Sequence, residues 1–160
     1  MVNGSLVIDT SNINDARKDI DKAFSLKKVI IVVARGDEFN RKILENKKVD
    51  LFLLRSLSES GRNSRLKQRD SGLNQVLCAL AKENNITFGL DFNFLVKNKD
   101  NKDYFSRVMQ NIRLFNKYKS KFILINSLKV NRQDLNGFLL SLGLNTEMTK
   151  YAIENSFDLD

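Results

Sequence analysis

The sequence contains no histidine, no proline and no tryptophan, and it has one cysteine in 160 residues. Without imidazole, catalytic triads, cysteine–histidine pairs and histidine-based zinc sites are excluded. A single thiol, Cys78, excludes an internal disulfide, and its place in an apolar helical pattern predicts a small buried side chain. Carboxylate-only magnesium chemistry stays open, because hard cations take oxygen ligands.

Long hydrophobic runs are also absent. Apolar runs such as Val29–Ala34 and Phe122–Ile125 are far too short to cross a bilayer, which takes about 20 residues. The first residues show no basic segment followed by an apolar stretch and a cleavage site, so we expect no export. The length suits one domain over residues 1–160. We therefore expect a soluble, cytoplasmic protein with no membrane contact, and we attribute its 19 asparagines to compositional bias.

Positive charge is in excess and unevenly distributed. The chain carries 27 basic and 19 acidic residues. Residues 55–82 hold six basic and two acidic side chains, and residues 97–132 hold ten and two. Two basic blocks in an otherwise balanced chain are typical of a surface that binds phosphates, although a solvated face would look the same.

Short apolar runs alternate with segments of helical spacing. We predict five strands, over residues 5–9, 28–34, 49–54, 86–92 and 122–126. Helices are predicted between them and in the tail, where residues 132–142 and 145–156 are joined at Gly143, a suitable residue after a helix end. Strands that read as continuous apolar runs between helices favour a parallel sheet, and the class is α/β.

Two predicted helices carry detailed expectations. In the first, Ser11 is the expected N-cap, and Phe24 shares the buried face with Ile20. In the long helix before the fifth strand, Met109 is expected on the buried stripe and Arg107 off it. Between the third strand and the next helix, residues 56–70 are polar, basic and aperiodic, which favours a functional loop over a simple connector.

The segment after this loop carries a more specific pattern. Residues 69–90 read Arg-Asp-Ser-Gly-Leu-Asn-Gln-Val-Leu-Cys-Ala-Leu-Ala-Lys-Glu-Asn-Asn-Ile-Thr-Phe-Gly-Leu. This resembles archaeal ribonuclease P protein component three, the counterpart of the eukaryotic thirty-kilodalton subunit. Sequences of this family contain the motif Asp-Ser-Gly-(Leu/Met)-(Asn/Asp)-x-Val-Leu-x-x-Leu-Ala-x-Glu-Asn, which is followed by a strand.

Further blocks agree with this family in the same order. Gly36-Asp37-x-x-Asn40-Arg41 followed by Val49-Asp50 is similar to a Gly-Asp…Asn-Arg…Val-Asp segment, and residues 104–118 and 134–152 resemble its Arg-rich helix and closing helices. The family's Arg-x-Pro-Arg-Asp-Leu segment appears here without proline, at residues 130–135. Because a full barrel takes about 200–250 residues, we expect an abbreviated TIM-barrel-like (β/α) fold, an incomplete barrel of about five or six mostly parallel strands.

The resemblance implies a subunit of ribonuclease P, the ribonucleoprotein that removes the 5′ leader from precursor tRNA. The catalyst there is RNA, and magnesium is expected on that RNA, so we expect the isolated chain to bind no cofactor or metal and to hold no catalytic residue. The implied partners are ribonuclease P RNA, precursor tRNA indirectly, a smaller ferredoxin-like subunit in a heterotetramer, and other ribonuclease P proteins. Lysine and arginine would screen the RNA phosphates.

Nine basic residues are candidates for RNA contact. They lie near a helix start, in the basic loop, on the long helix and after the fifth strand: Arg41, Arg62, Arg65, Lys67, Arg69, Arg107, Arg113, Lys129 and Arg132. The lysines at positions 117, 119 and 121 have a structural explanation, because cations are favourable at a helix C-terminus.

Two other functions remain open. Asp9 and Asp91 each end a predicted strand, as acids do in PIN and NYN-type ribonucleases, where two or three carboxylates bind magnesium and activate water. Acids in such places are also common as helix caps. A general RNA-binding scaffold outside ribonuclease P would show the same basic blocks.

Overall fold

Five parallel strands form one sheet in the computed structural model, which describes residues 4–55 and 70–159. The strands are β1 (Ser5–Ile8), β2 (Val29–Val33), β3 (Leu51–Leu53), β4 (Thr87–Asp91) and β5 (Phe122–Ile125). Their order across the sheet is their order along the chain, and every neighbouring pair is parallel. The predicted α/β class and the predicted strands are confirmed, each strand being trimmed by one or more residues.

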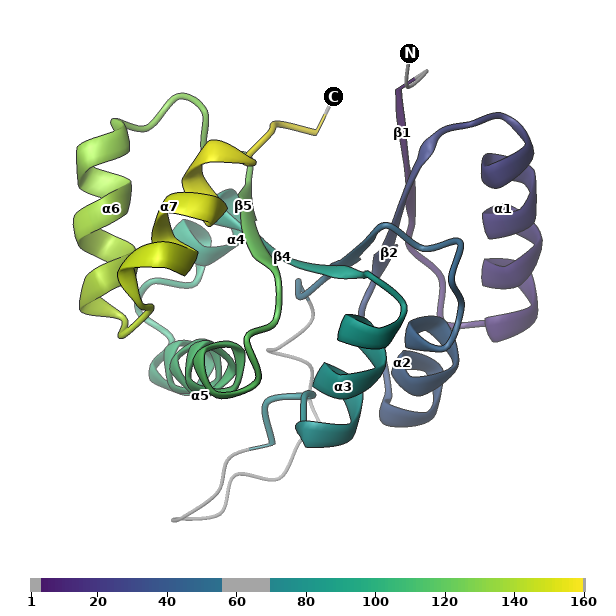
Figure 1. Cartoon of the computed structure of the whole chain (residues 1–160), viewed down its shortest axis with the longest axis horizontal. Helices are drawn as coiled ribbons and strands as arrows, with labels where there is room; N and C mark the ends of the chain where they lie inside the picture. Colours follow the sequence, from purple (N-terminus) through teal and green to yellow (C-terminus); the bar gives the residue numbers. More distant parts are fainter. Residues whose placement is uncertain (1–3, 56–69, 160) are drawn as a thin grey trace.

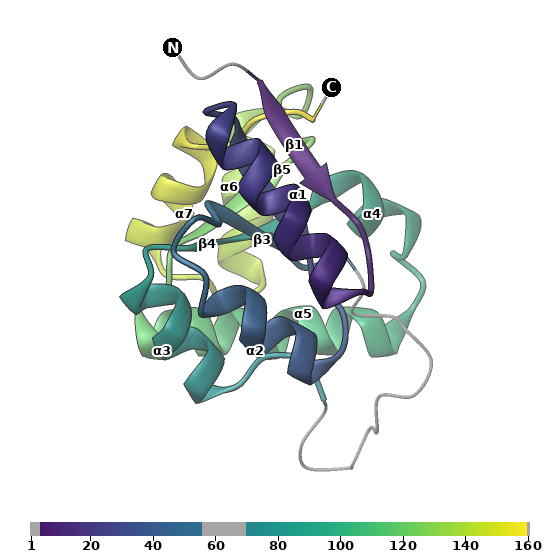
Figure 2. The same ribbon diagram turned by 90° about the vertical axis from the view of Figure 1, so that its right-hand side faces the viewer.

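Helices follow or separate these strands. They are α1 (Ile13–Ser25), α2 (Asp37–Leu44), α3 (Gln75–Glu83), α4 (Phe92–Lys97), α5 (Lys102–Tyr118), α6 (Arg132–Ser141) and α7 (Thr146–Glu154). Figure 1 shows them in an arc around the sheet. Both termini lie at the top of that view, where the arc is open. Seen from the α1 side, α1 lies in front of β1, with α2 and α3 below (Figure 2). No helix in the described part of the chain is long and apolar enough to cross a membrane.

The helix-covered face of the sheet holds the larger core. Alternate strand residues such as Ile30, Phe52 and Phe88 are fully buried against the helices. The ring of Phe115 on α5 stacks between those of Phe88 and Phe122, with centroids 5.0 and 5.1 Å away. The thiol of Cys78 on α3 is buried in this core, as predicted, and burial raises its pKa.

In the described residues no helix covers the opposite, inner face of the sheet, which is open at β1, where Val7 is 36% exposed, and buried at β2, β3 and β5. Its side chains form a second cluster, which consists of Ile31, Val33, Leu51, Leu53, Ile123 and Ile125. Phe157 and Leu159 of the C-terminal tail pack against this cluster. The tail therefore covers part of the inner face.

The tail is attached to the free edge of β5. Phe157 forms a parallel bridge with Ile125, and its carbonyl oxygen accepts a hydrogen bond from Asn126 N at 3.0 Å. The Asn126 side chain in turn accepts one from Leu159 N at 2.8 Å. In the described residues β1 and β5 do not pair with each other, so the sheet is not closed, in agreement with the expected incomplete barrel.

Asparagine caps most of the helices. Five helices begin after an asparagine whose side chain accepts hydrogen bonds from the first turn: Asn12, Asn74, Asn101, Asn131 and Asn145. A short side-chain acceptor at this position satisfies a backbone N–H that would otherwise be unpaired. The expectation that Ser11 caps α1 is therefore wrong by one residue, and five of the nineteen asparagines have a structural role as helix caps. Gly143 does follow the end of α6 as predicted, with hydrogen bonds from Gly143 N to Leu140 O and from Leu144 N to Leu139 O.

Three helix predictions are corrected. Phe24 is 56% exposed, because Ala23 completes the buried face of α1 with Ala16 and Ile20. On α5 the buried stripe is rotated: Met109 is 37% exposed, whereas Arg107, expected off the stripe, is buried at 7%.

Helix α4 was not predicted, because its six residues directly follow β4 and continue that strand's apolar run.

Substitution of Gly89 on β4 tests how tightly the inner face is packed. A Cβ there would lie 2.9 Å from Leu51 Cδ2 and 3.0 Å from Ile125 Cδ1. We expect Gly89→Ala to lower the free energy of unfolding by about 1–3 kcal/mol through overpacking. The control is Gly137→Ala in α6, which meets nothing within 4 Å and should raise stability by about 0.5–1 kcal/mol. Urea unfolding measures both, and an equal response of the two variants would contradict this account of the inner face.

Candidate nucleic-acid interface

Polar side chains gather where the five strands end. One comes from each strand end or the residue or two after it: Asp9, Arg35, Arg55, Asp91 and Asn126. Parallel strands bring their carboxyl ends to one edge of the sheet, which is where α/β proteins usually bind ligands. The chemistry of this edge depends on how these groups pair.

Asp91 is the most buried of them, and Arg55 binds it. Arg55 Nη2 and Nε lie 2.8 and 3.2 Å from Asp91 Oδ2, and the Asp91 side chain is only 5% exposed. Its other oxygen, Oδ1, accepts hydrogen bonds from Phe94 N, where it caps α4, and from Asn126 Nδ2, both at 3.2 Å. Both carboxylate oxygens are thus occupied by groups from α4 and from the segments that follow β3 and β5.

Asp9 forms a second ion pair, with Arg35. The Asp9 side chain is 46% exposed. The backbone of Arg35 is held by the buried Asn40, whose Oδ1 accepts from Arg35 N at 2.6 Å and whose Nδ2 donates to Arg35 O at 2.9 Å. Asn40 belongs to the Gly-Asp-x-x-Asn-Arg block, so this block shapes the loop that presents Arg35.

The Asp-Ser-Gly block also builds a loop. Asp70 Oδ1 accepts a hydrogen bond from Gly72 N at 3.0 Å, and Gly72 has a φ of +77°, which glycine adopts without strain. Ser71 is buried, and its carbonyl oxygen accepts from Asn111 Nδ2 of α5 at 3.4 Å. The block therefore ties the start of α3 to α5.

The strand-end carboxylates do not form a metal cluster. Within residues 4–55 and 70–159, no group of three or more acidic or cysteine side chains could hold a metal ion. Asp9 and Asp91 each bind an arginine, which supplies the positive charge that a metal would otherwise provide. Their geometry gives the nuclease hypothesis no support.

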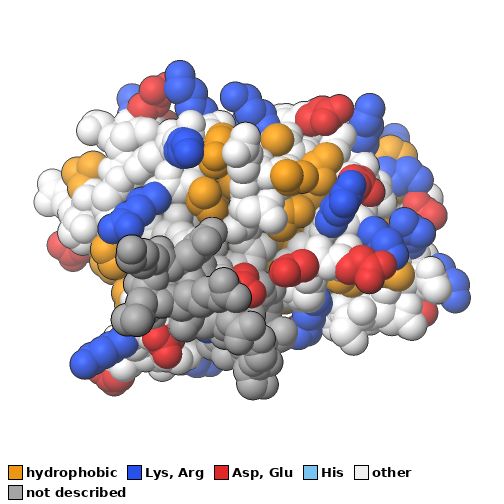
Figure 3. Space-filling view, turned by 90° about the horizontal axis from the view of Figure 1, so that it is seen from below, with side chains coloured by type: hydrophobic (Ala, Val, Ile, Leu, Met, Phe, Trp, Pro, Cys, Tyr) orange, Lys and Arg blue, Asp and Glu red, His pale blue; other side chains and the backbone are white. Residues whose placement is uncertain are grey.

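The described RNA-contact candidates fall into separate groups. Arg41 on α2 is exposed and binds Glu45 one turn away, with Nε 3.1 Å from Oε1. Arg113 is exposed on α5, and α3 lies between these two helices (Figure 1). Figure 3 shows this side, where the lysines and arginines of the described residues are scattered among acidic and uncharged side chains.

Lys129 and Arg132 form a different pair, in the connection from β5 to α6. Both are exposed, and they lie beyond the carboxyl end of β5, a few residues from Asn126. Arg132 is the first residue of α6, where a cation is unfavourable next to the helix dipole. The dipole therefore does not explain these two charges, as it does for lysines at helix C-termini.

Five candidates remain, of which one is buried and four lie outside the described residues. Arg107 is buried on α5, which differs from its expected place on the outer face of that helix. Arg62, Arg65, Lys67 and Arg69 lie outside the described residues. RNA contact by any of the nine residues stays a prediction.

The structure also contains a basic hollow that the sequence analysis did not predict. Lys27 and Lys28 precede β2, Lys47 and Lys48 lie just before β3, and together with Phe24 they line a hollow of about 490 Å³. The available signal was the recurrence of a lysine pair shortly before two consecutive strands. Because those strands are parallel and adjacent, the two pairs meet at the amino edge of the sheet.

A solved structure shares this fold. The chain is similar to one chain of a cryo-EM structure of archaeal ribonuclease P with mature tRNA, with a TM-score of 0.69 and 23% sequence identity. The match covers 94% of this chain and 64% of that one, so this chain spans less than two thirds of that chain's length. No family model and no curated protein matches the sequence.

The two strand-end ion pairs should differ in their importance for stability. Asp91→Asn removes a buried charge and leaves Arg55 without its partner, which we expect to cost about 2–3 kcal/mol after allowing for the partial exposure of Arg55. Asp9→Asn breaks a more exposed pair and should cost less than about 1 kcal/mol. Urea unfolding of the two variants tests this order, and equal losses would argue against the central role given to Asp91.

Tyr104 provides a pH-dependent test next to Asp91. Burial, and then the charge of Asp91, raise the pKa of this phenol above its ordinary value of 10. The folded state thus holds the phenolic proton more tightly than the unfolded state, so this part of the stability is present below about pH 10 and is lost as the pH rises further.

The Tyr104→Phe variant isolates this effect. The Tyr104 hydroxyl has no hydrogen-bond partner in the described residues, so near pH 8 the free energy of unfolding of the variant should be within about 1 kcal/mol of that of wild type. Above about pH 10 the free energy of unfolding of the variant should rise relative to that of wild type by up to about 1.4 kcal/mol per pH unit. Parallel stability–pH curves, measured by urea unfolding, would show that Tyr104 titrates normally.

Proposed function

We propose that this chain is a protein subunit of ribonuclease P that supports the RNA-catalysed removal of the 5′ leader from precursor tRNA. The observation that carries the proposal is the fold likeness over 94% of the chain to a chain of an archaeal ribonuclease P structure. The blocks at residues 36–50 and 69–90, which resemble protein component three, support the finer assignment to that subunit.

In this role the chain binds RNA and lowers its electrostatic self-repulsion. Lysine and arginine replace part of the counterion atmosphere of closely packed phosphates, so the RNA holds a compact fold with less magnesium. The net charge of +8 and the exposed Lys129 and Arg132 at the carboxyl edge are consistent with this task. Catalysis and its magnesium belong to the RNA in this proposal, and the chain contributes no catalytic group.

The proposed assembly contains further components. The resemblance to component three supports a smaller ferredoxin-like subunit, two copies of which would join two copies of this chain. Ribonuclease P RNA and other ribonuclease P proteins complete the particle, and precursor tRNA is contacted through it. We place the chain in the cytoplasm on the same grounds.

Reconstitution tests the proposal through the magnesium requirement. Leader removal by the catalytic RNA is measured over a magnesium titration without protein, with each of the two proteins alone, and with both together. We expect both together to lower the magnesium concentration for half-maximal cleavage severalfold, because their cations replace counterions. A magnesium requirement that both proteins leave unchanged would overturn the assignment.

Two controls sharpen this experiment. Lys129→Ala/Arg132→Ala should raise the magnesium requirement again, whereas Lys97→Ala/Lys99→Ala, which removes the same charge at the end of α4, should have a smaller effect. The isolated chain should not cleave precursor tRNA in magnesium. Cleavage that is lost in Asp9→Asn would instead support a carboxylate-dependent ribonuclease.

A further inference from the structure

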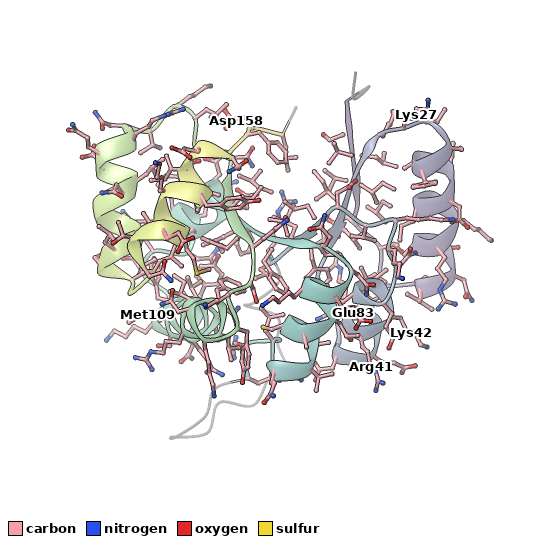
Figure 4. All side chains as sticks on the ribbon, in the orientation of Figure 1. Lys27, Arg41, Lys42, Glu83, Met109 and Asp158 are labelled. Atoms are coloured by element: carbon pink, nitrogen blue, oxygen red, sulfur yellow. The ribbon has the colours of Figure 1, made fainter. Side chains whose placement is uncertain are left out.

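The basic hollow at the amino edge of the sheet lies away from the candidates considered above. It is lined by the four lysines at positions 27, 28, 47 and 48, together with Phe24 and Asp50. Figure 4 labels Lys27 near the top of the view, just after α1, and Arg41 near the bottom, on α2. A volume of about 490 Å³ is within the range of small-molecule sites, roughly 300–1,000 Å³.

The lining of the hollow carries a net positive charge, because it holds four lysines and one aspartate. Asp50 is engaged, because its Oδ2 accepts a hydrogen bond from Ile30 N at 2.8 Å. Lys48 is also engaged, with its Nζ 2.7 Å from Asp21 Oδ1. The ammonium groups of Lys27, Lys28 and Lys47 have no carboxylate partner in the parts of the chain that are described, so the hollow favours an anion.

An aromatic ring is exposed in the same place. Phe24, in the last turn of α1, has more than half of its surface in contact with solvent. Lys48 Nζ lies 5.2 Å from the centroid of this ring and so helps to hold it in position through a cation–π contact. A fixed, exposed phenyl ring is a surface on which a flat, apolar group can stack.

Helix electrostatics explains only part of this arrangement. α1 ends at Ser25 and α2 at Leu44, so the lysine pairs follow helix C-termini, where cations are favourable. That effect does not require an exposed aromatic ring, nor does it require pairs from two different helices to line one hollow.

We propose that this hollow binds one unpaired nucleotide of RNA. The base stacks on the ring of Phe24, and the flanking phosphates contact Lys27, Lys28 and Lys47. Aromatic rings combined with lysines are how proteins hold single-stranded nucleic acid, because every base has a face that can stack. The inference rests on the proposed RNA-binding role and adds both the site and the kind of RNA that it takes.

Binding of a fluorescein-labelled ten-nucleotide oligouridine to the full chain tests the stacking contact. Fluorescence anisotropy should show binding that Phe24→Ala weakens roughly 5- to 100-fold. Phe24→Leu keeps an apolar side chain but removes the aromatic ring, so it should be similarly weak. Thermal unfolding checks that both variants remain folded, as expected for an exposed residue. Wild-type affinity in Phe24→Leu would overturn the proposal.

The salt dependence of the same binding tests the phosphate contacts. Lys27→Ala/Lys47→Ala should reduce the slope of log affinity against log salt by about 0.7 for each phosphate that the protein no longer neutralises. Lys97→Ala/Lys99→Ala removes the same charge elsewhere and should leave the slope close to that of wild type. Equal slopes in the two double variants would overturn the proposal.

Competition distinguishes an unpaired nucleotide from other anions. An unlabelled ten-base-pair RNA duplex and inorganic tripolyphosphate should each displace the oligouridine more weakly than unlabelled oligouridine does. A duplex that competes equally well, or tripolyphosphate that binds wild type and Phe24→Ala alike and displaces the oligomer fully, would reduce the hollow to a general anion site and overturn the proposal.

The magnesium titration separates this inference from the proposed function. If Phe24→Ala leaves oligouridine binding unchanged while the wild-type protein still lowers the magnesium requirement, the hollow is rejected and the ribonuclease P assignment stands. If Phe24 is needed for binding but the wild-type protein does not affect the magnesium requirement, the nucleotide site stands and the assignment is rejected.

Discussion

A parallel sheet has two apolar faces, and in the described residues helices pack against only one of them. In a closed barrel the second face lines an interior filled by side chains from all the strands. With five strands, the inner cluster around Leu51 and Ile125 packs closely over Gly89 and is contacted by the tail residues Phe157 and Leu159. The packing of the tail on this face and the glycine on β4 both meet this one requirement.

Much of the fold could be predicted because its strands are continuous apolar runs. Such runs identify buried strands without any tertiary information. The errors occurred where tertiary packing decides: Phe24 has the right helical spacing for burial, yet Ala23 faces the sheet in its place. Arg107 was placed outside because it is charged, whereas the orientation of α5 buries it. The brief helix α4 gave no periodic signal of its own.

The candidate site was less predictable, for two physical reasons. First, the motif residues Asn40 and Asp70 act on the backbone of loops, and a sequence pattern does not distinguish a side chain that holds a loop from one that contacts a ligand. Second, surfaces combine residues that are distant in sequence, and only the parallel pairing of β2 with β3 brings Lys28 and Lys47 into one hollow. Asp91 was noticed as a strand-end acid, but its partner Arg55 was not.

The order of the strands in space has a consequence for how such a chain can change in length. Because each strand lies next to its neighbours in sequence, adding or removing a βα unit at either end of the sheet leaves every other strand with the same partners. No connection has to be rerouted across the sheet. A chain of 160 residues can therefore superpose along nearly all of its length on a much longer chain. The sheet can therefore be extended by βα units at its edge strands, and we expect a longer relative to have its additional strands there.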